Sequence, residues 1–127
     1  MRPWLAVAAL NGLLAVGVGA IGAHVLRATA SPERLAWLDT GLRYHMWHAL
    51  ALLAVACLLA AGGTRPPGLA LRLSAWLFAG GIALFSFGLY LMAFAGLHTL
   101  GPIVPTGGLL LLAGWATLFV HALGSRS

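Results

Sequence analysis

The chain has 127 residues, of which 61% are hydrophobic and only 7% are charged, and its mean hydropathy is +0.98. Soluble domains carry about 45–50% apolar and about 25% charged residues, so this composition excludes a water-soluble or disordered protein. The net charge of +5 does not indicate nucleic-acid binding, because the seven arginines stand apart at the ends of apolar runs. Arginines lie in this way where membrane spans meet lipid headgroups.

Four apolar stretches cover most of the chain, at residues 4–26, 42–61, 71–95 and 103–123. Each is close to the ~20 residues that cross ~30 Å of hydrocarbon at 1.5 Å per residue. Lone strands cannot satisfy their backbone groups in lipid, so each stretch predicts a transmembrane helix. We therefore expect one all-α domain over residues 1–127, a four-transmembrane-helix bundle. The first stretch is too long for the apolar part of a signal peptide and is expected to be retained.

The first apolar stretch is crowded with small side chains. These are Ala15, Gly17, Gly19, Ala20, Gly22 and Ala23. Lipid provides little hydrophobic drive between helices, so close approach through small residues is what holds them together. We expect the first helix to pack against neighbours rather than to face lipid. Similar tight packing is expected at the glycines of the third and fourth stretches, which are Gly80, Gly81, Gly88, Gly107, Gly108 and Gly114. Homo-oligomers or a membrane-protein partner are open alternatives for the same small-residue faces.

The connection before the second span predicts a helix of its own. Ser31 is a suitable N-cap, Pro32 suits the first helical position, and Glu33 lies where the helix dipole favours an acid. Leucines at 35, 38 and 42 repeat at helical spacing. We expect a short interfacial helix over residues 32–40 that bends into the second span at Gly41.

The other two connections, 62–68 and 96–102, are short and rich in glycine and proline. They predict antiparallel neighbouring helices. With four spans both termini share one side, which carries four arginines against three on the other. The positive-inside rule then places both termini in the cytoplasm, by a margin of one charge.

Polar residues inside the spans fall at one depth, in the outer leaflet on this orientation. Counting 1.5 Å per residue from the outer ends of the spans brings together residues from all four helices. The candidate cluster is His24, Tyr44, His45, His48, Ser86, Tyr90 and Thr106. Its default role is hydrogen bonding between helices, which satisfies polar groups in lipid.

Three other roles for this cluster stay open. Spacing of three residues between His45 and His48, with His24 from another helix, is compatible with a metal site, and haem would need two facing histidines. Intramembrane histidines also occur in proton or solute pathways, so a transporter or channel component is an alternative. The spans contain no Asp or Glu that could orient a histidine for nucleophilic catalysis, so we expect a protein that is not an enzyme.

Several short motifs make the chain similar to a known family. They are residues 19–24 (GAIGAH), Tyr44 with 48–50 (HAL), 85–90 (FSFGLY), 105–108 (PTGG) and 114–115 (GW). In this order and over nearly the whole chain, they resemble the signature segments of the YgdD-like family of small bacterial inner-membrane proteins. The family usually has Gln at the position of His45, which weakens the three-histidine metal site and leaves His24 and His48 as its candidates.

The resemblance implies a four-span inner-membrane protein without an established activity. We expect no cofactor, a lipid bilayer as the surroundings of the chain, and an outer-leaflet cluster that stabilises the bundle or receives a small ligand, a lipid or a partner helix.

Overall fold

The computed structural model describes residues 2–124, which form four long helices joined by short links. Helix α1 spans Pro3–Ile21 and continues through one π-helical turn, η1, at Gly22–Leu26. Helices α2, α3 and α4 span Pro32–Ala61, Leu69–Ala95 and Ile103–Gly124. All four are long and apolar enough to cross a membrane, as the sequence predicts.

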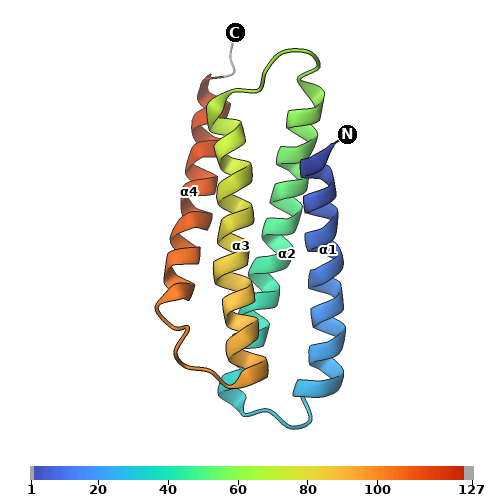
Figure 1. Ribbon diagram of the computed structural model, residues 1–127, viewed down its shortest axis with the longest axis vertical. Helices are drawn as coiled ribbons and strands as arrows, with labels where there is room; N and C mark the ends of the chain where they lie inside the picture. The colour runs from blue at the N-terminus through green and yellow to red at the C-terminus, as the bar shows by residue number, and fades with distance from the viewer. Residues whose placement is uncertain (1, 125–127) are drawn as a thin grey trace.

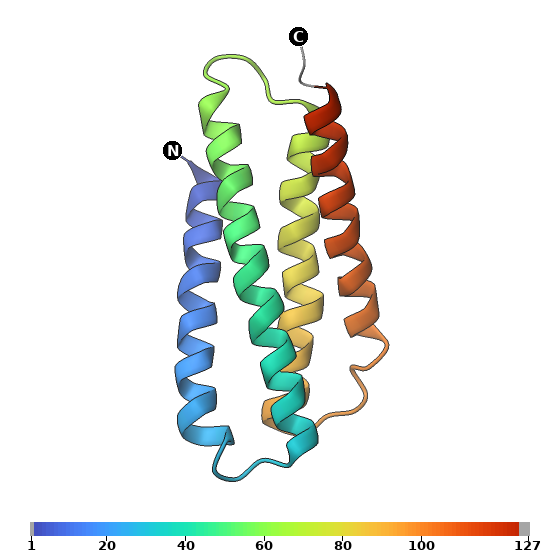
Figure 2. The ribbon, with the colours of Figure 1, turned by 180° about the vertical axis from the view of Figure 1, so that it is seen from behind.

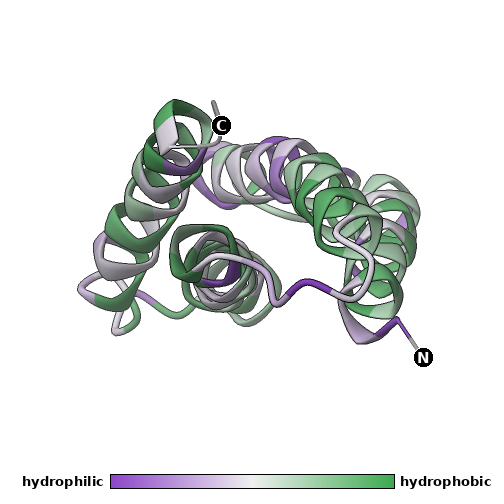
Figure 3. Cartoon of the chain, turned by 90° about the horizontal axis from the view of Figure 1, so that it is seen from above, coloured by the Kyte–Doolittle hydropathy of each residue, from purple (hydrophilic) through white to green (hydrophobic). Residues whose placement is uncertain are grey.

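The helices run alternately up and down, so that each packs against its neighbour in sequence (Figure 1). The reverse view shows the same order (Figure 2). We call the end with both chain termini and the 62–68 link the terminal end, and the end with links 27–31 and 96–102 the distal end. Seen from above, hydrophobic residues occur along all four helices (Figure 3). Many large hydrophobic side chains, such as Leu13, Leu112 and Phe119, are exposed, as lipid contact requires.

The prediction of a separate interfacial helix is wrong: residues 32–40 are the first turns of α2. Ser31 does cap this helix, since its Oγ accepts from the Arg34 N–H at 3.3 Å, and the helix continues through Gly41 without a break. Gly41 instead lets α3 approach, because a Cβ there would lie 2.9 Å from Cε1 of Tyr90. Leu38 is fully buried with Leu26 and Tyr90, so the leucine stripe packs inside the bundle rather than along the membrane surface.

The prediction that the small residues of the first span are all packed is also corrected. Ala15 and Gly22 are buried, but Ala20 and Ala23 are exposed, and a Cβ on Gly17 would meet nothing within 4 Å. The reason is the position of α1 at the edge of the bundle, where it packs chiefly against α2. One neighbour covers only one stripe of a helix.

Helices α3 and α4 have the most extensive contact of the helix pairs, and glycine makes their close packing possible. A Cβ on Gly107 would collide with the backbone N of Phe85 and with Leu84, and one on Gly114 would lie 2.7 Å from Phe78 Cδ1. The expectation of tight glycine packing is confirmed for this pair. The main apolar core continues from here to the terminal end, around Phe78, Leu52 and Val55, none of which is exposed.

Candidate functional site: a hydrogen-bonded network across the bundle

His45 links three helices from the middle of the bundle. It is completely buried on α2. Its Nε2 lies 3.0 Å from Asn11 Oδ1 on α1, and its Nδ1 lies 2.8 Å from the Tyr90 hydroxyl on α3. Both ring nitrogens therefore hold neighbouring helices to α2, which is how buried polar groups are satisfied in lipid.

The partners of His45 fix its tautomer. Asn11 Nδ2 donates to the Val7 carbonyl at 2.9 Å, so Asn11 Oδ1 is the acceptor and Nε2 of His45 carries the proton. A charged imidazolium here would have no carboxylate beside it, so Nδ1 is unprotonated and accepts from the Tyr90 hydroxyl. The 3.3 Å contact from that hydroxyl to the Gly41 carbonyl is then secondary.

His48 joins α2 to α4 and has the opposite tautomer. Indole N–H groups only donate, so the 3.0 Å contact from Trp115 Nε1 to His48 Nε2 requires that Nε2 be unprotonated. The proton is on Nδ1, which donates to the Tyr44 carbonyl at 2.7 Å. Both histidines of α2 are therefore neutral, and both are fully hydrogen-bonded.

The remaining predicted cluster residues divide into three kinds. Tyr90 belongs to the network, whereas Ser86 is completely buried and its Oγ has no hydrogen-bond partner. His24 lies exposed on the π-helical turn, and its side chain forms no hydrogen bond with any residue from 2 to 124. Thr106 is exposed as well, and its hydroxyl donates to the Pro102 carbonyl of its own first turn at 3.3 Å. The prediction that His24 and Thr106 join the cluster is wrong.

The hydrogen bonds of the network leave His45 and His48 no free ring nitrogen for a metal or a haem. In the described part of the chain, no three His, Cys, Asp or Glu side chains come together in a group that could hold a metal ion. A ligating imidazole needs a free nitrogen, and in His45 and His48 one nitrogen donates and the other accepts. Both also lie on α2, so they do not face each other across an apolar slot as bis-imidazole haem ligation requires.

Tyr44 faces a groove on the lipid-exposed side of the network. Its ring is stacked parallel to His48, with centroids 6.0 Å apart, and is 36% exposed. Beside it a hollow of about 240 Å³ lies between α2 and α4, lined by aromatic rings and leucines that include Trp47, Leu112 and Trp115. A second hollow of about 360 Å³ shares Tyr44 and Leu112 and continues toward Pro105. The Tyr44 hydroxyl makes no hydrogen bond with any described residue.

Arginines close the distal end. Arg34, in the first turn of α2, donates from Nε to the Ala93 carbonyl at 2.6 Å and from Nη2 to the Phe94 carbonyl at 2.8 Å. Both carbonyls belong to the last turn of α3 and have no partner within that helix, and the helix dipole favours a cation there. Arg27 pairs with Asp39 at 3.1 Å.

Asn11 and Trp115 belong to the network, although the sequence analysis does not include them in the cluster. Counting along the spans places Asn11 in the other leaflet, and the apolar surroundings of Trp115 predict a packing residue. For Asn11 the signal is its rarity, because it is the only Asn in the chain and a lone amide in a span needs a partner on another helix.

Comparison with known proteins agrees with this architecture. Residues 18–108 match the family model described as "Protein of unknown function (DUF423)". A UPF0382 membrane protein of Haemophilus influenzae is 40% identical over 125 residues, which is 98% of this chain and 96% of the relative. UPF0382 membrane protein YwdK of Bacillus subtilis is 37% identical, over 96% of this chain and 97% of its own length.

UPF0382 inner membrane protein YgdD of Escherichia coli K12 is 36% identical, over 96% of this chain and 90% of the relative. No solved structure matches. The resemblance expected from the motifs is thereby confirmed over nearly the full length. With four helices able to span a bilayer, this chain is a multi-pass membrane protein and belongs to the DUF423, or UPF0382, family.

Proposed function

We propose that this chain is a non-enzymatic inner-membrane protein that binds a lipid-like molecule, with an apolar body and one hydrogen-bonding group, in the groove between α2 and α4. The His45 and His48 network holds the walls of this groove in place. The observation that carries the proposal is the Tyr44 hydroxyl, which has no hydrogen-bond partner in the described chain and lies beside an aromatic hollow that opens to lipid.

The chemistry of the groove supports an amphiphile. A phenol hydroxyl in hydrocarbon is costly without a partner, and the surrounding surface offers mainly apolar contact through Trp47, Leu112 and Trp115. Ligand sites commonly combine an apolar lining with a few placed polar groups. A molecule with one hydroxyl or carbonyl satisfies Tyr44 and covers the rings.

The network leaves no usable base beside the groove, which supports a non-enzymatic role. A histidine acts as a general base through a free nitrogen held near the substrate, but Nε2 of His48 already accepts from Trp115. The two acidic residues, Glu33 and Asp39, lie in the first turns of α2, and Asp39 pairs with Arg27 rather than with a histidine.

Photo-crosslinking tests the proposal. The purified protein, in a bilayer of phosphatidylcholine, is irradiated with a diazirine-bearing long-chain alcohol or with the matching alkane, and the labelled peptides are identified by mass spectrometry. We expect the alcohol to label the peptides around Tyr44 and Leu112 several-fold more than the alkane does. Equal labelling by the two probes would contradict the proposal.

Two variants locate the label. Tyr44→Phe removes the hydroxyl and keeps the ring, so the alcohol should lose its advantage over the alkane. Gly108→Leu fills the groove, since Gly108 lines both hollows, and should reduce labelling by both probes. A matched change on the open face of α1, Gly12→Leu, where a Cβ meets nothing within 4 Å, should leave labelling unchanged. Melting curves of each variant verify that the bundle is folded.

A further inference from the structure

The two ends of the bundle differ in charge and in how their arginines are used. The distal end holds three arginines and both acids of the chain, and Arg27 and Arg34 are engaged there. The terminal end holds Arg2, Arg65 and Arg72 and, in its described part, no acid. None of these three arginines forms a hydrogen bond or ion pair from its side chain to another described residue. This end therefore attracts anions.

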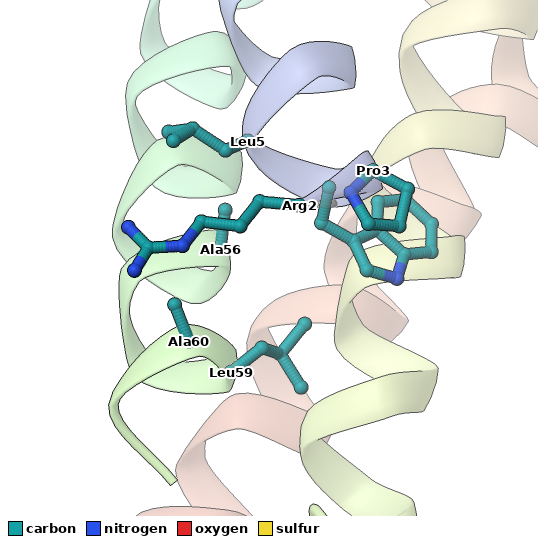
Figure 4. A pocket seen from close by; sticks show the side chains of 7 residues that line it. Arg2, Pro3, Leu5, Ala56, Leu59 and Ala60 are labelled. Carbon is teal, nitrogen blue, oxygen red and sulfur yellow. The ribbon is translucent and has the colours of Figure 1, made fainter. Parts of the chain in front are cut away.

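Arg2 differs from the other two because it lies over an apolar groove. Helix α2 extends beyond the start of α1 (Figure 1), and its last turns include the small side chains of Ala56, Ala60 and Ala61. Two hollows of about 140 and about 290 Å³ share Arg2, Leu5, Ala56 and Ala60. The Arg2 side chain runs across α2 at Ala56, between Leu5 and Ala60 (Figure 4).

We infer that this groove binds an anionic phospholipid from the leaflet at the terminal end. Its phosphate would meet the Arg2 guanidinium, which matches phosphate oxygens with two parallel N–H donors. One acyl chain would lie along Leu5 and over Ala56 and Ala60, where the small side chains leave room. The complementary charge of this end selects an anionic lipid over a zwitterionic one. This site is separate from the α2–α4 groove of the proposed function.

Trp4 provides a built-in reporter. It lines the smaller hollow and contacts Trp76 edge to face, with ring centroids 5.0 Å apart. The full chain is reconstituted in phosphatidylcholine that contains, at equal mole fractions, either dibrominated phosphatidylglycerol or dibrominated phosphatidylcholine. Bromine quenches tryptophan fluorescence on contact. We expect stronger quenching by phosphatidylglycerol, and we expect this excess to disappear in Trp4→Phe.

Three variants separate the site from general attraction to a basic surface. Arg2→Gln should lower the preference for phosphatidylglycerol about five-fold, the effect of one arginine near an anionic surface. Ala60→Leu keeps the charge and fills the groove, and should lower it similarly. Arg72→Gln removes an exposed charge at the same end, outside the groove, and should lower the preference much less than Arg2→Gln does.

The inference is overturned by equal quenching from the two brominated lipids, by loss of the preference in Arg72→Gln to the same extent as in Arg2→Gln, or by full preference in Ala60→Leu. Arg2 is exposed at the end of the chain, so its replacement leaves the bundle folded, which a melting curve verifies.

Discussion

The distal and terminal halves of the bundle are held together by different interactions. From the middle of the bundle to its distal end, side-chain hydrogen bonds cross from helix to helix through His45, Tyr90 and Arg34. Toward the terminal end the contacts are apolar, around Phe78, Leu52 and Val55. The difference teaches that a small membrane protein can confine the hydrogen bonds between its helices to one part of its length.

This concentration has a consequence for both halves. Van der Waals packing and a few hydrogen bonds must together hold transmembrane helices that gain little from leaving lipid. In this chain α2 is hydrogen-bonded to all three other helices, through His45 to α1 and α3 and through His48 to α4. The hydrogen bonds of His45 and His48 determine which helices meet and in what register, and the apolar contacts add buried area.

The largest effect is expected in the apolar half. Phe78→Ala removes a fully buried ring that contacts His48 and Trp115, and we expect it to lower the free energy of unfolding by about 3–5 kcal/mol. Reversible unfolding in mixed micelles measures this loss. Phe119→Ala, at a ring that is 65% exposed to lipid, is the control and should change stability little. Equal losses would mean that the apolar half is not packed around Phe78.

The next effect tests the polar half. His45→Leu removes two interhelical hydrogen bonds and leaves Asn11 and Tyr90 without their partner, so we expect a loss of about 2–3 kcal/mol in the same assay. His45→Gln can still hydrogen-bond and should recover part of the loss. If the His45→Leu variant is as stable as the unchanged protein, the hydrogen bonds of His45 contribute nothing to the stability of the fold.

Arg34→Gln should cost about 1–2 kcal/mol, because two carbonyls at the end of α3 lose a charged donor. The signature of this variant is local. Amide hydrogen exchange should rise in the last turn of α3 and stay unchanged in the apolar core. An increase in hydrogen exchange that is equal along the whole of α3 would show that Arg34 does not cap this helix.

The smallest effect is expected at the surface. Asp39→Asn breaks the Arg27 ion pair, but both side chains are about half exposed, at 53% and 47%. Exposed ion pairs contribute little, so we expect a change below about 0.5 kcal/mol that diminishes further in high salt. A loss of stability as large as that of Arg34→Gln would mean that the Arg27–Asp39 pair contributes substantially to the stability of the distal end.

The sequence predicts the helices well and their side-chain partners only in part. Length and hydropathy locate four spans, since both are local properties, and the motif Ser31–Pro32–Glu33 predicts the start of α2. Depth alone indicates His45, His48 and Tyr90. It cannot say which way a residue points, so it wrongly includes His24 and Thr106, which are exposed, and it misses Asn11 and Trp115.

The error at residues 32–40 has a similar origin. A leucine stripe near a membrane surface suits both a helix lying in the interface and an upright helix packed in a bundle. Only the partners of Leu38, which are Leu26 and Tyr90 on other segments, decide between them.

The tautomers of the two α2 histidines test the central claim most directly. In nitrogen-15 NMR of the protein in a bilayer, the side-chain nitrogens of His45 and His48 are assigned by replacing each histidine in turn. The network predicts two neutral imidazoles with opposite tautomers, the proton on Nε2 in His45 and on Nδ1 in His48. A charged imidazolium at either position, or the same tautomer at both, would contradict it.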